Sequence, residues 1–324
     1  MKIDTKDRKI LYQLDLNARQ SFSQIGKKVG LSKNTVAYRV NKLEEDGIIK
    51  GYYTVIDCFK LGYASLRFYL TLQYTTPEIK KEIIDYFIND KYTYFIGSIE
   101  GRYDLVIIMW VKQFQKFHSF WQETLKRYRD YFQQQMFSSY IQLLHYPDSW
   151  LLKDAPAADR NHFQVIGRGV EVDVEPFDVE VLKLIGANAR MPLTDIAKEL
   201  GESSSKVNYH LKKMRDQNVI RGFRVALDIS KLDYKQFKVD IDFKDYSKIN
   251  EITDYLIANP HLFYITRTAG HADLEPTLRV QGICQLHEIL NDLTETFPGA
   301  IKNYQYFYIT KMHKLNYMPG CEYV

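Results

Sequence analysis

Hydrophobic residues at the start of the chain recur with the period of an α-helix. In the segment DRKILYQLDLNA, Ile10, Leu11 and Leu14 occupy positions i, i+1 and i+4, so they share one helical face. We therefore predict an amphipathic helix that packs through this face.

Two shorter helices are predicted next, with a tight turn between them. Ser21 and Gln24 have the spacing of a capping box and Gly30 is typical of a helix end, which together indicate a helix from about residue 22 to this glycine. Ser32 is a natural N-cap for the following helix. The residues predicted to point inward from it are Val36, Val40 and Leu43. Those on its polar and basic outer face are Lys33, Asn34, Thr35, Tyr38, Arg39 and Lys42. This arrangement is typical of a helix-turn-helix.

After residue 64 the pattern changes to short strands alternating with amphipathic helices. The predicted strands include SLRFYLTLQY, two strands about a turn in YTYFIGSIEGRYDLVIIMWV, and QMFSSYIQLLHY. The predicted helices are PEIKKEIIDYFIND and FQKFHSFWQETLKRYR. The order strand, helix, strand, strand, helix, strand indicates a split βαβ domain of ferredoxin-like type.

The whole pattern occurs twice in the chain. At a constant offset, Asp7 aligns with Asp178 and Tyr63 with Tyr234, and after a two-residue deletion Gly101 aligns with Gly270. We therefore predict an α+β protein of two tandem units, each a winged-helix-like helix-turn-helix domain followed by a ferredoxin-like βαββαβ domain.

The pattern also predicts the boundaries of the domains. The helix-turn-helix domains are expected at residues 1–52 and 172–223, and the ferredoxin-like domains at 60–150 and 231–318. Residues 151–171 carry the Pro, Gly and Ala of a linker, with the unit boundary near Ala158, although HFQVIGRGVEVDV could add a strand. Pro276 falls inside a predicted strand and indicates an edge position or a bulge.

Composition narrows the class of protein. The formal charge is only +4 and 45% of the residues are hydrophobic, so any attraction to nucleic acid must come from local charge. Cys58, Cys284 and Cys321 have no metal-ligand or disulfide spacing, which favours a reducing cytoplasm and predicts no metal site. The amino terminus lacks the apolar core of a signal peptide, and the run LVIIMWV is too short to cross a bilayer, so no membrane association is expected.

The region from Asp7 to Tyr63 resembles the amino-terminal region of the Lrp/AsnC (feast/famine) family of transcription regulators, and GRYD resembles the family's Gly-x-x-Asp loop. An Asn-Ala-Arg triplet occurs in both units, at Asn17 and Asn188. The resemblance implies a DNA-binding helix-turn-helix joined to a ligand-responsive domain that dimerises through its sheet. We accordingly expect the two units to pair within one chain, with whole chains able to assemble further.

The resemblance and the outer faces of the helices suggest residues that contact double-stranded DNA. In the first unit those on the recognition helix are Ser32, Lys33, Asn34, Thr35, Tyr38, Arg39 and Lys42. Those expected to meet phosphate are Lys27 and Lys28. Arg39 is the strongest candidate because arginine can contact guanine or phosphate through two nitrogens, whereas any single lysine could equally be a solvated surface charge.

The second helix-turn-helix carries less positive charge. Residues 1–50 contain eleven Lys or Arg against six Asp or Glu, while residues 172–222 contain eight of each. Its corresponding candidates are Ser204, Ser205, Lys206, His210 and Lys213. His210 replaces an arginine and is interpreted either as a titrating group or as an exposed polar residue without a sensing role. The first copy is therefore expected to supply most phosphate contacts.

The resemblance also suggests an effector site, for a small molecule such as an amino acid, at the two glycine loops. Its candidate residues are Gly101, Arg102, Asp104, Gly270, His271 and Asp273. The alternative is that each glycine only permits a tight turn and each aspartate bonds nearby backbone. Because IEGRYD and TAGHAD differ, two equivalent sites are not assumed.

Two other functions remain open. Siroheme decarboxylases of haem biosynthesis share this duplicated fold, but His118, His145, His271 and His287 are scattered and no catalytic spacing stands out, so no enzyme activity is expected. The chain could also be an effector-binding assembly module whose helix-turn-helices no longer bind DNA.

Overall fold

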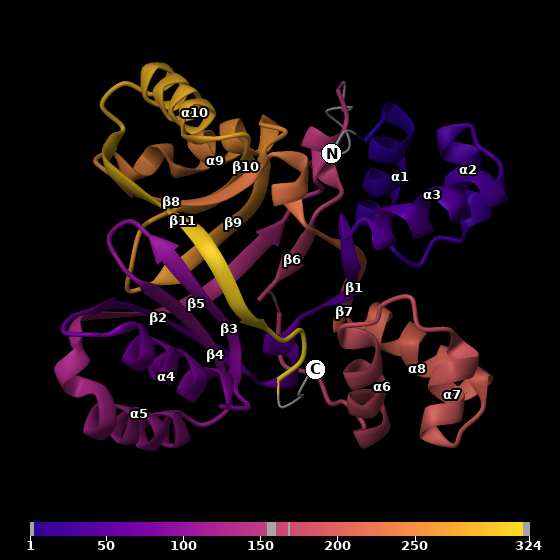
Figure 1. The fold of residues 1–324 in the computed structure, drawn as a ribbon, viewed down its shortest axis with the longest axis horizontal. Coiled ribbons are helices and arrows are strands. Elements are labelled where there is room, and N and C mark those ends of the chain that lie inside the picture. Colours follow the sequence, from indigo (N-terminus) through magenta and orange to yellow (C-terminus); the bar gives the residue numbers. More distant parts are fainter. Residues whose placement is uncertain (1–2, 154–159, 168, 320–324) are drawn as a thin grey trace.

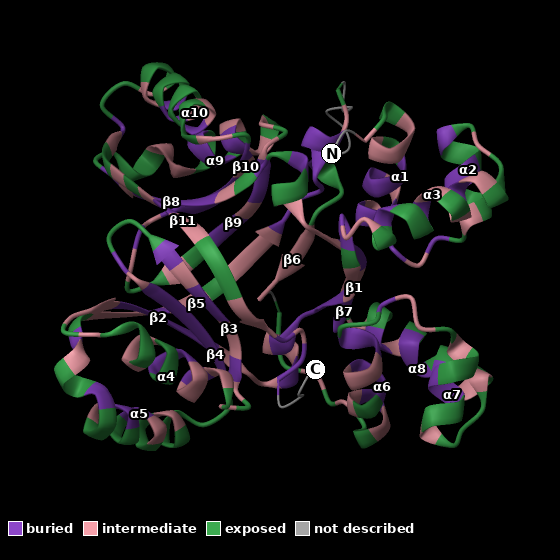
Figure 2. Ribbon diagram, in the orientation of Figure 1, coloured by how far each residue is buried: buried purple, intermediate pink, exposed green. Residues whose placement is uncertain are grey.

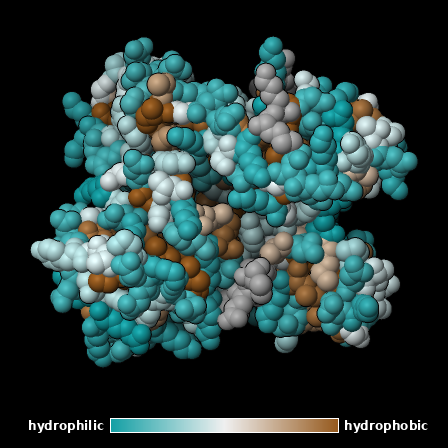
Figure 3. All heavy atoms as spheres, in the orientation of Figure 1, coloured by the Kyte–Doolittle hydropathy of each residue, from teal (hydrophilic) through white to brown (hydrophobic). Residues whose placement is uncertain are grey.

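The computed structural model describes residues 3–153, 160–167 and 169–319 of the chain. In Figure 1 the two helix-turn-helix domains lie beside each other on one side of the molecule, and the two ferredoxin-like domains lie on the other. The face in this view is predominantly hydrophilic, with hydrophobic residues in separate patches (Figure 3). Among the described residues, no helix combines the length and hydropathy needed to cross a membrane.

The first helix-turn-helix forms as the sequence predicts. Its helices are α1 (Thr5–Leu16), α2 (Phe22–Val29) and α3 (Lys33–Glu45). Ser21 and Gln24 make both hydrogen bonds of a capping box, and Gly30 ends α2 at a φ of 69°, the left-handed conformation that glycine adopts without strain. Ser32 caps α3 by accepting from the Thr35 N–H. These local signals therefore set the helix boundaries.

The second helix-turn-helix repeats this plan, and its second helix ends and its third helix begins with the same kinds of cap. Its helices are α6 (Pro176–Gly186), α7 (Leu193–Leu200) and α8 (Ser204–Asp216). Gly201 ends α7 in the left-handed conformation, as Gly30 does for α2. Ser203 caps α8 through the Lys206 N–H. The second domain has therefore kept the fold while its surface has changed.

Each unit then continues into the predicted ferredoxin-like domain. The first comprises β2 (Ala64–Leu72), α4 (Pro77–Ile88), β3 (Thr93–Glu100), β4 (Leu105–Val111), α5 (Phe114–Tyr128) and β5 (Phe132–His145). The second comprises β8 (Lys235–Phe243), α9 (Ile249–Ala258), β9 (Leu262–Ala269), β10 (Glu275–Val280), α10 (Ile283–Thr296) and β11 (Ile301–Leu315). Figure 2 shows the helices of both domains exposing residues on their outer faces.

The two ferredoxin-like sheets join into one ring. The strand order is β2-β4-β3-β11-β8-β10-β9-β5, and β2 also pairs with β5, which closes the ring. Two of the junctions cross between units: β3 pairs with β11 and β5 with β9, both antiparallel. The predicted pairing of the two units within one chain is therefore confirmed, and the closed sheet leaves neither unit with an open edge in this ring.

Each helix-turn-helix domain packs against residues of the other unit. Strand β1 (Ile49–Ile56) pairs with β7 (Ile220–Leu227) in a separate two-stranded sheet. The core of the first helix-turn-helix includes Val225 and Tyr234 of the second unit, and the core of the second includes Ile56 and Trp110 of the first. Neither domain would keep its apolar contacts if it were cut out of the chain.

The described residues of the segment between the units contact both ferredoxin-like domains. Strand β6 (Gln164–Ile166) pairs with β5, so the additional strand suggested by the sequence is present. Buried Arg160 donates to the carbonyls of Pro147, Ile257 and Leu262. The proposed boundary near Ala158 lies outside the described residues.

Of the two alternatives predicted for Pro276, an edge position or a bulge, the structure excludes the edge position and supports the bulge. Strand β10 lies between β8 and β9, and Pro276 sits opposite Ile265. The predicted bulge is close by, since the register with β9 shifts between Thr277 and Leu278. The ladder to β8 begins only at Thr277, so the missing N–H of the proline falls outside that ladder.

Because the units pair within one chain, we expect a folded monomer of 38.3 kDa, or closed assemblies of whole chains, in light scattering. In a mixture of ¹⁴N- and ¹⁵N-labelled protein, cross-links between the β3 and β11 regions should carry a single isotope label. Cross-links with mixed labels would show that the pairing occurs between chains instead.

Candidate functional site

The outer face of α3 is open and polar. Lys33, Asn34 and Lys42 are exposed, and Tyr38 projects with 67% of its surface accessible. Lys27 and Lys28 are also exposed on the preceding helix, where Lys28 donates to Gln20 at 2.7 Å. The predicted lysines of the first copy are thus exposed on the two consecutive helices α2 and α3.

Arg39 is held differently from its neighbours. Its guanidinium lies 2.7 Å from carboxylate oxygens of both Asp4 and Asp7 at the start of α1. These ion pairs clamp α3 to α1 and neutralise much of the positive charge that Arg39 would offer to a phosphate. A base contact by Arg39 stays a prediction, and such a contact would have to compete with two carboxylates.

His210, at the position matching Arg39, is buried rather than exposed. Only 5% of its surface is accessible, and its Nδ1 lies 2.7 Å from the buried carboxylate of Asp178. The ammonium group of Lys213 lies 3.2 Å from the same carboxylate and 2.6 Å from the carboxylate of Glu175. Burial by itself would raise the pKa of Asp178, but hydrogen bonds from Glu175 N–H, His210 and Lys213 lower it on balance. The interpretation of His210 as an exposed residue is therefore wrong, because its ring completes the α6–α8 packing.

The accessible face of α8 is formed by residues on the side of the helix away from His210. Ser205, Lys212 and Tyr209 are exposed, the last at 64%, while Lys206 is paired with Glu202. Ser204 is only half-exposed at the start of the helix. Tyr209 and Lys212 were not among the predicted contacts, although the alignment of Tyr38 with Tyr209 in the repeat was a signal for the tyrosine. One exposed tyrosine on each recognition helix is the feature that both faces share.

The two helix-turn-helix domains are fixed to each other by reciprocal contacts. Arg19 donates to the carbonyl of Ala189 at 2.7 Å and to that of Met191 at 3.1 Å. Arg190 donates in turn to the carbonyls of Ala18 and Gln20. The repeated Asn-Ala-Arg triplets therefore hold the recognition helices at a set separation.

The two glycine loops mark the junction between the units. Asp104 accepts the Leu72 N–H and Asp273 the Phe243 N–H, both at 2.8 Å, so each aspartate ties its loop to its own sheet. A Cβ on Gly101 would lie 3.1 Å from the Cβ of Phe307 in the other unit. The loops thus have the structural role considered for them, and an effector contact is an additional hypothesis.

The residues beside these loops differ between the units. Arg102 is exposed and only 3.4 Å from the Gln305 side chain, whereas His271 is held 2.7 Å from Asp240 in the ring interior. One carboxylate oxygen of Asp240 is buried with no partner in the described part of the chain. The structure therefore supports the expectation that the two loops are not equivalent.

A buried ion cluster lies next to His271. Glu275 is completely buried and pairs with Arg67 through both oxygens, at 2.6 and 2.7 Å, and with Lys238 at 2.5 Å. Glu275, Asp240 and His271 lie close enough to share a cation, but two basic side chains already neutralise the glutamate. We therefore assign no metal to this cluster.

The cluster predicts how stability depends on pH. Burial would raise the pKa of Glu275, but Lys238 and Arg67 lower it well below its usual range. Its contribution to the free energy of unfolding is therefore present above the unfolded-state pKa of about 4.3 and is lost as pH falls further. Urea titrations between pH 7 and pH 3 should show this loss. The Glu275→Gln variant should have a lower free energy of unfolding at pH 7 than the wild type. Its free energy of unfolding should also fall less steeply below pH 4, and an equally steep fall would contradict the assignment.

The comparisons with known proteins agree with this architecture. A model of winged helix-turn-helix DNA-binding domains matches residues 3–50 and 175–221, one match in each unit. The chain is 34% identical over 110 residues to the HTH-type transcriptional regulator LrpA of Pyrococcus horikoshii, covering 34% of this chain and 77% of that protein. It is 33% identical over 131 residues to the HTH-type transcriptional regulator Ptr1 of Methanocaldococcus jannaschii, covering 38% and 82%.

A solved structure matches both units together. The siroheme decarboxylase NirDL superposes with a TM-score of 0.65 over 98% of this chain and 94% of that one, at 12% sequence identity. At this identity the similarity establishes the duplicated fold alone. Together with the relatives that match a single unit, these findings show that the chain belongs to the Lrp/AsnC family of helix-turn-helix transcription regulators and joins two family units in tandem.

Proposed function

We propose that the protein is a sequence-specific DNA-binding transcription regulator. The observation that carries the proposal is the reciprocal Arg19 and Arg190 contact, which fixes two folded helix-turn-helix domains at one separation. Two recognition helices at a fixed distance suit successive sites on one face of double-stranded DNA. Each presents an exposed tyrosine and hydroxyl or amide groups able to contact bases or phosphates.

The two domains would contribute unequally to binding. Lys27, Lys33 and Lys42 of the first are exposed without ion pairs in the described part of the chain, whereas Lys206 and Lys213 of the second are paired with carboxylates. The first recognition face would therefore release more counterions from the duplex and account for most of the salt dependence.

A small-molecule effector such as an amino acid is the second part of the proposal. Its support is the position of the two glycine loops at the junction of the units, next to the unpaired oxygen of Asp240. A ligand bound there would contact both units and could shift their relative position. Because Arg102 and His271 differ in charge and burial, we expect one loop to bind more tightly than the other.

Genome-wide footprinting of the full chain, followed by a gel shift on the recovered fragments and on the DNA upstream of its own gene, tests the proposal. We expect protection of defined sites with one strong half-site per chain. A protein with Lys33→Ala and Lys42→Ala is the matched negative control. Uniform weak binding to all sequences, or none, would instead favour an assembly module without specific DNA recognition.

A siroheme decarboxylase-like enzyme is the second candidate, and one cluster favours it. Buried His145 lies with its ring centre 4.5 Å from that of Tyr264 and 6.4 Å from that of Tyr53, which stacks on Tyr317 at 4.6 Å. The Nε2 of His145 is buried and makes no hydrogen bond to a described residue. Burial, with Arg224 and Arg279 nearby, lowers the pKa of His145 well below its usual range and keeps the ring neutral.

Absorbance spectroscopy separates this candidate from the regulator. A tetrapyrrole substrate should give a shifted absorption band with the full chain and a reaction product that His145→Ala abolishes. An unchanged spectrum together with specific DNA binding would rule out the enzyme as the function of this protein.

A further inference from the structure

A histidine and two carboxylates meet where α6 contacts α8 in the second helix-turn-helix (Figure 1). Glu175 precedes α6, Asp178 lies in the first turn of that helix, and His210 lies on α8. The ligand atoms of these three residues all lie within 4.8 Å of one another. Imidazole nitrogen and carboxylate oxygen are ligands that zinc binds in proteins. The spacing of the cysteines, which predicts no metal site, has no bearing on such a cluster.

The equivalent position in the first unit holds a cation between two carboxylates. At the offset of the tandem repeat, Asp4, Asp7 and Arg39 are the counterparts of the three residues, in that order. The guanidinium of Arg39 lies 2.7 Å from a carboxylate oxygen of each aspartate. The second unit, with histidine in place of the arginine, has therefore lost that cation and gained a side chain that binds metals at the same place.

Lys213 partly replaces the missing arginine. Its ammonium group lies 2.6 Å from Glu175 and 3.2 Å from Asp178, whereas its counterpart Lys42 forms no ion pair in the described part of the chain. The lysine ammonium is a single point charge on a flexible chain, and 22% of this side chain is accessible. A cation that binds the carboxylates more tightly would therefore displace it into solvent.

The charges of the cluster favour a divalent cation. Glu175 and Asp178 carry two negative charges and Lys213 one positive charge, so one negative charge remains when the imidazole is neutral. The cluster around Glu275 differs, because two basic side chains there balance two acidic ones. A divalent ion in place of the ammonium would neutralise both carboxylates, one of which is completely buried.

The cluster is accessible from one side. The side chain of Glu175 is 59% accessible, whereas those of His210 and Asp178 are at 6% and 0%. One oxygen of Asp178 accepts the Glu175 N–H at 2.9 Å, and the other lies against the Nδ1 of His210. An ion would therefore arrive at the exposed glutamate and be held between it and two side chains that are already fixed in position.

We infer that Glu175, Asp178 and His210 bind a divalent transition-metal ion of the zinc type, which takes the place of the Lys213 ammonium. Mg²⁺ and Ca²⁺ fit the site less well, because both prefer oxygen ligands and a higher coordination number. The ion would join the start of α6 to the recognition helix α8 and so stabilise the second helix-turn-helix. The inference does not depend on DNA binding.

Isothermal titration of the full chain with Zn²⁺, after removal of metal by a chelator, tests the inference. The matched variant is His210→Arg, which restores the residue of the first unit and whose fold circular dichroism can verify. We expect the wild type to bind one more Zn²⁺ per chain than this variant, and Mg²⁺ to show no such difference. Equal numbers of bound ions at about 100 μM Zn²⁺ would overturn the inference.

A second variant changes only the exposed ligand. Glu175→Gln should weaken the same site at least about tenfold, because the amide is neutral and binds metal poorly. Since this side chain is largely in solvent, the variant should keep its fold if His210→Arg does not. Zn²⁺ affinity equal to that of the wild type would place the ion elsewhere and refute the site.

Lys213→Ala distinguishes a metal site from a cluster that only joins two helices. Removal of the competing ammonium should raise the affinity for Zn²⁺ at least about tenfold, since no charged contact has to be broken before the ion binds. Lys212→Ala removes the same charge from the neighbouring exposed position and should leave the affinity unchanged within about twofold. An affinity that Lys213→Ala lowers or leaves unchanged would contradict the proposed displacement.

Discussion

Replacing Asp15 by alanine should lower the free energy of unfolding by about 3–5 kcal/mol, the largest effect we expect from a single substitution. Asp15 accepts from Arg224 through both carboxylate oxygens, at 2.9 and 2.7 Å, and each side chain is only 1% accessible. The substitution would leave Arg224 buried without a carboxylate, since its other contacts are to Gln164 and the carbonyl of Tyr146.

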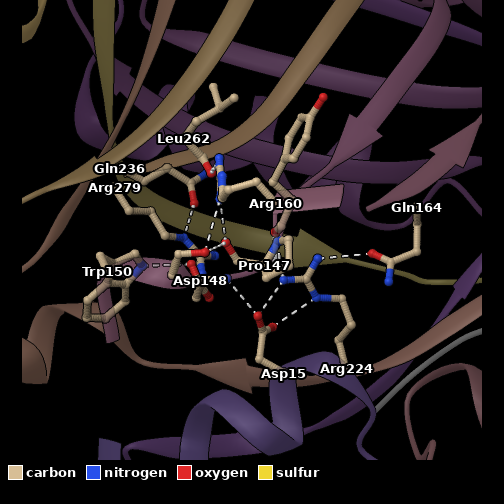
Figure 4. Close-up of polar contacts among 12 residues, drawn as sticks. Asp15, Pro147, Asp148, Trp150, Arg160, Gln164, Arg224, Gln236, Leu262 and Arg279 are labelled. Atoms are coloured by element: carbon tan, nitrogen blue, oxygen red, sulfur yellow. Dashed lines mark hydrogen bonds and ion pairs between the residues drawn. The ribbon is translucent and has the colours of Figure 1, made fainter. Parts of the chain in front are cut away.

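The same network joins parts of the chain that are far apart in sequence (Figure 4). Asp15 also accepts the N–H of Asp148, which pairs with Arg279 of β10 at 2.5 Å. The first helix-turn-helix is thereby tied through buried charges to the second ferredoxin-like domain. In the repeat, the counterparts of Asp15 and Arg224 are Gly186 and Tyr53, so the other half does not reproduce this ion pair.

Urea denaturation at pH 7 measures the effect. Lys81→Ala, which removes an exposed pair with Asp85, is the control and should change the free energy of unfolding by less than about 1 kcal/mol. A loss of similar size in both variants would contradict the role assigned to the buried pair.

The second large effect concerns DNA. Lys33→Ala combined with Lys42→Ala should weaken specific binding at least tenfold and reduce the salt dependence by about 0.9 log units for each lost phosphate contact. The matching changes at Lys206 and Lys213 should alter the salt dependence little, because both lysines already lie on carboxylates. Equal changes in slope for the two pairs would show that the copies bind equally.

Arg39 is a poorer target for this experiment than the sequence indicates. Arg39→Ala would remove two ion pairs within the domain as well as any DNA contact, so a loss of binding would have two explanations. For a related reason the full chain is required, since each helix-turn-helix packs against residues of the other unit.

Features set by neighbouring residues could be predicted from the sequence. The capping box of Ser21 and Gln24 and the stop at Gly30 depend only on short-range hydrogen bonds and on φ, and the structure confirms them. The duplication likewise predicted the pairing of the units, because two sheets that can dimerise are present on one chain.

Features set by distant residues could not be predicted. The burial of His210 depends on Asp178, thirty-two positions earlier, and the ion pairs of Arg39 depend on the start of α1. The central position of Pro276 depends on which strands flank β10, a property of the closed ring rather than of the local pattern. The buried charges around Arg224 also join four separated segments, and no spacing in the sequence signals them.

The central claim is that one chain uses two unequal helix-turn-helix domains to recognise DNA. A salt titration of full-length protein on its footprinted site, comparing wild type with the Lys33→Ala/Lys42→Ala variant, tests it most directly. The account predicts a steep dependence of affinity on salt for the wild type and a shallower one for the variant. An identical slope for both proteins, or wild-type binding that does not discriminate the site from unrelated DNA, would contradict it.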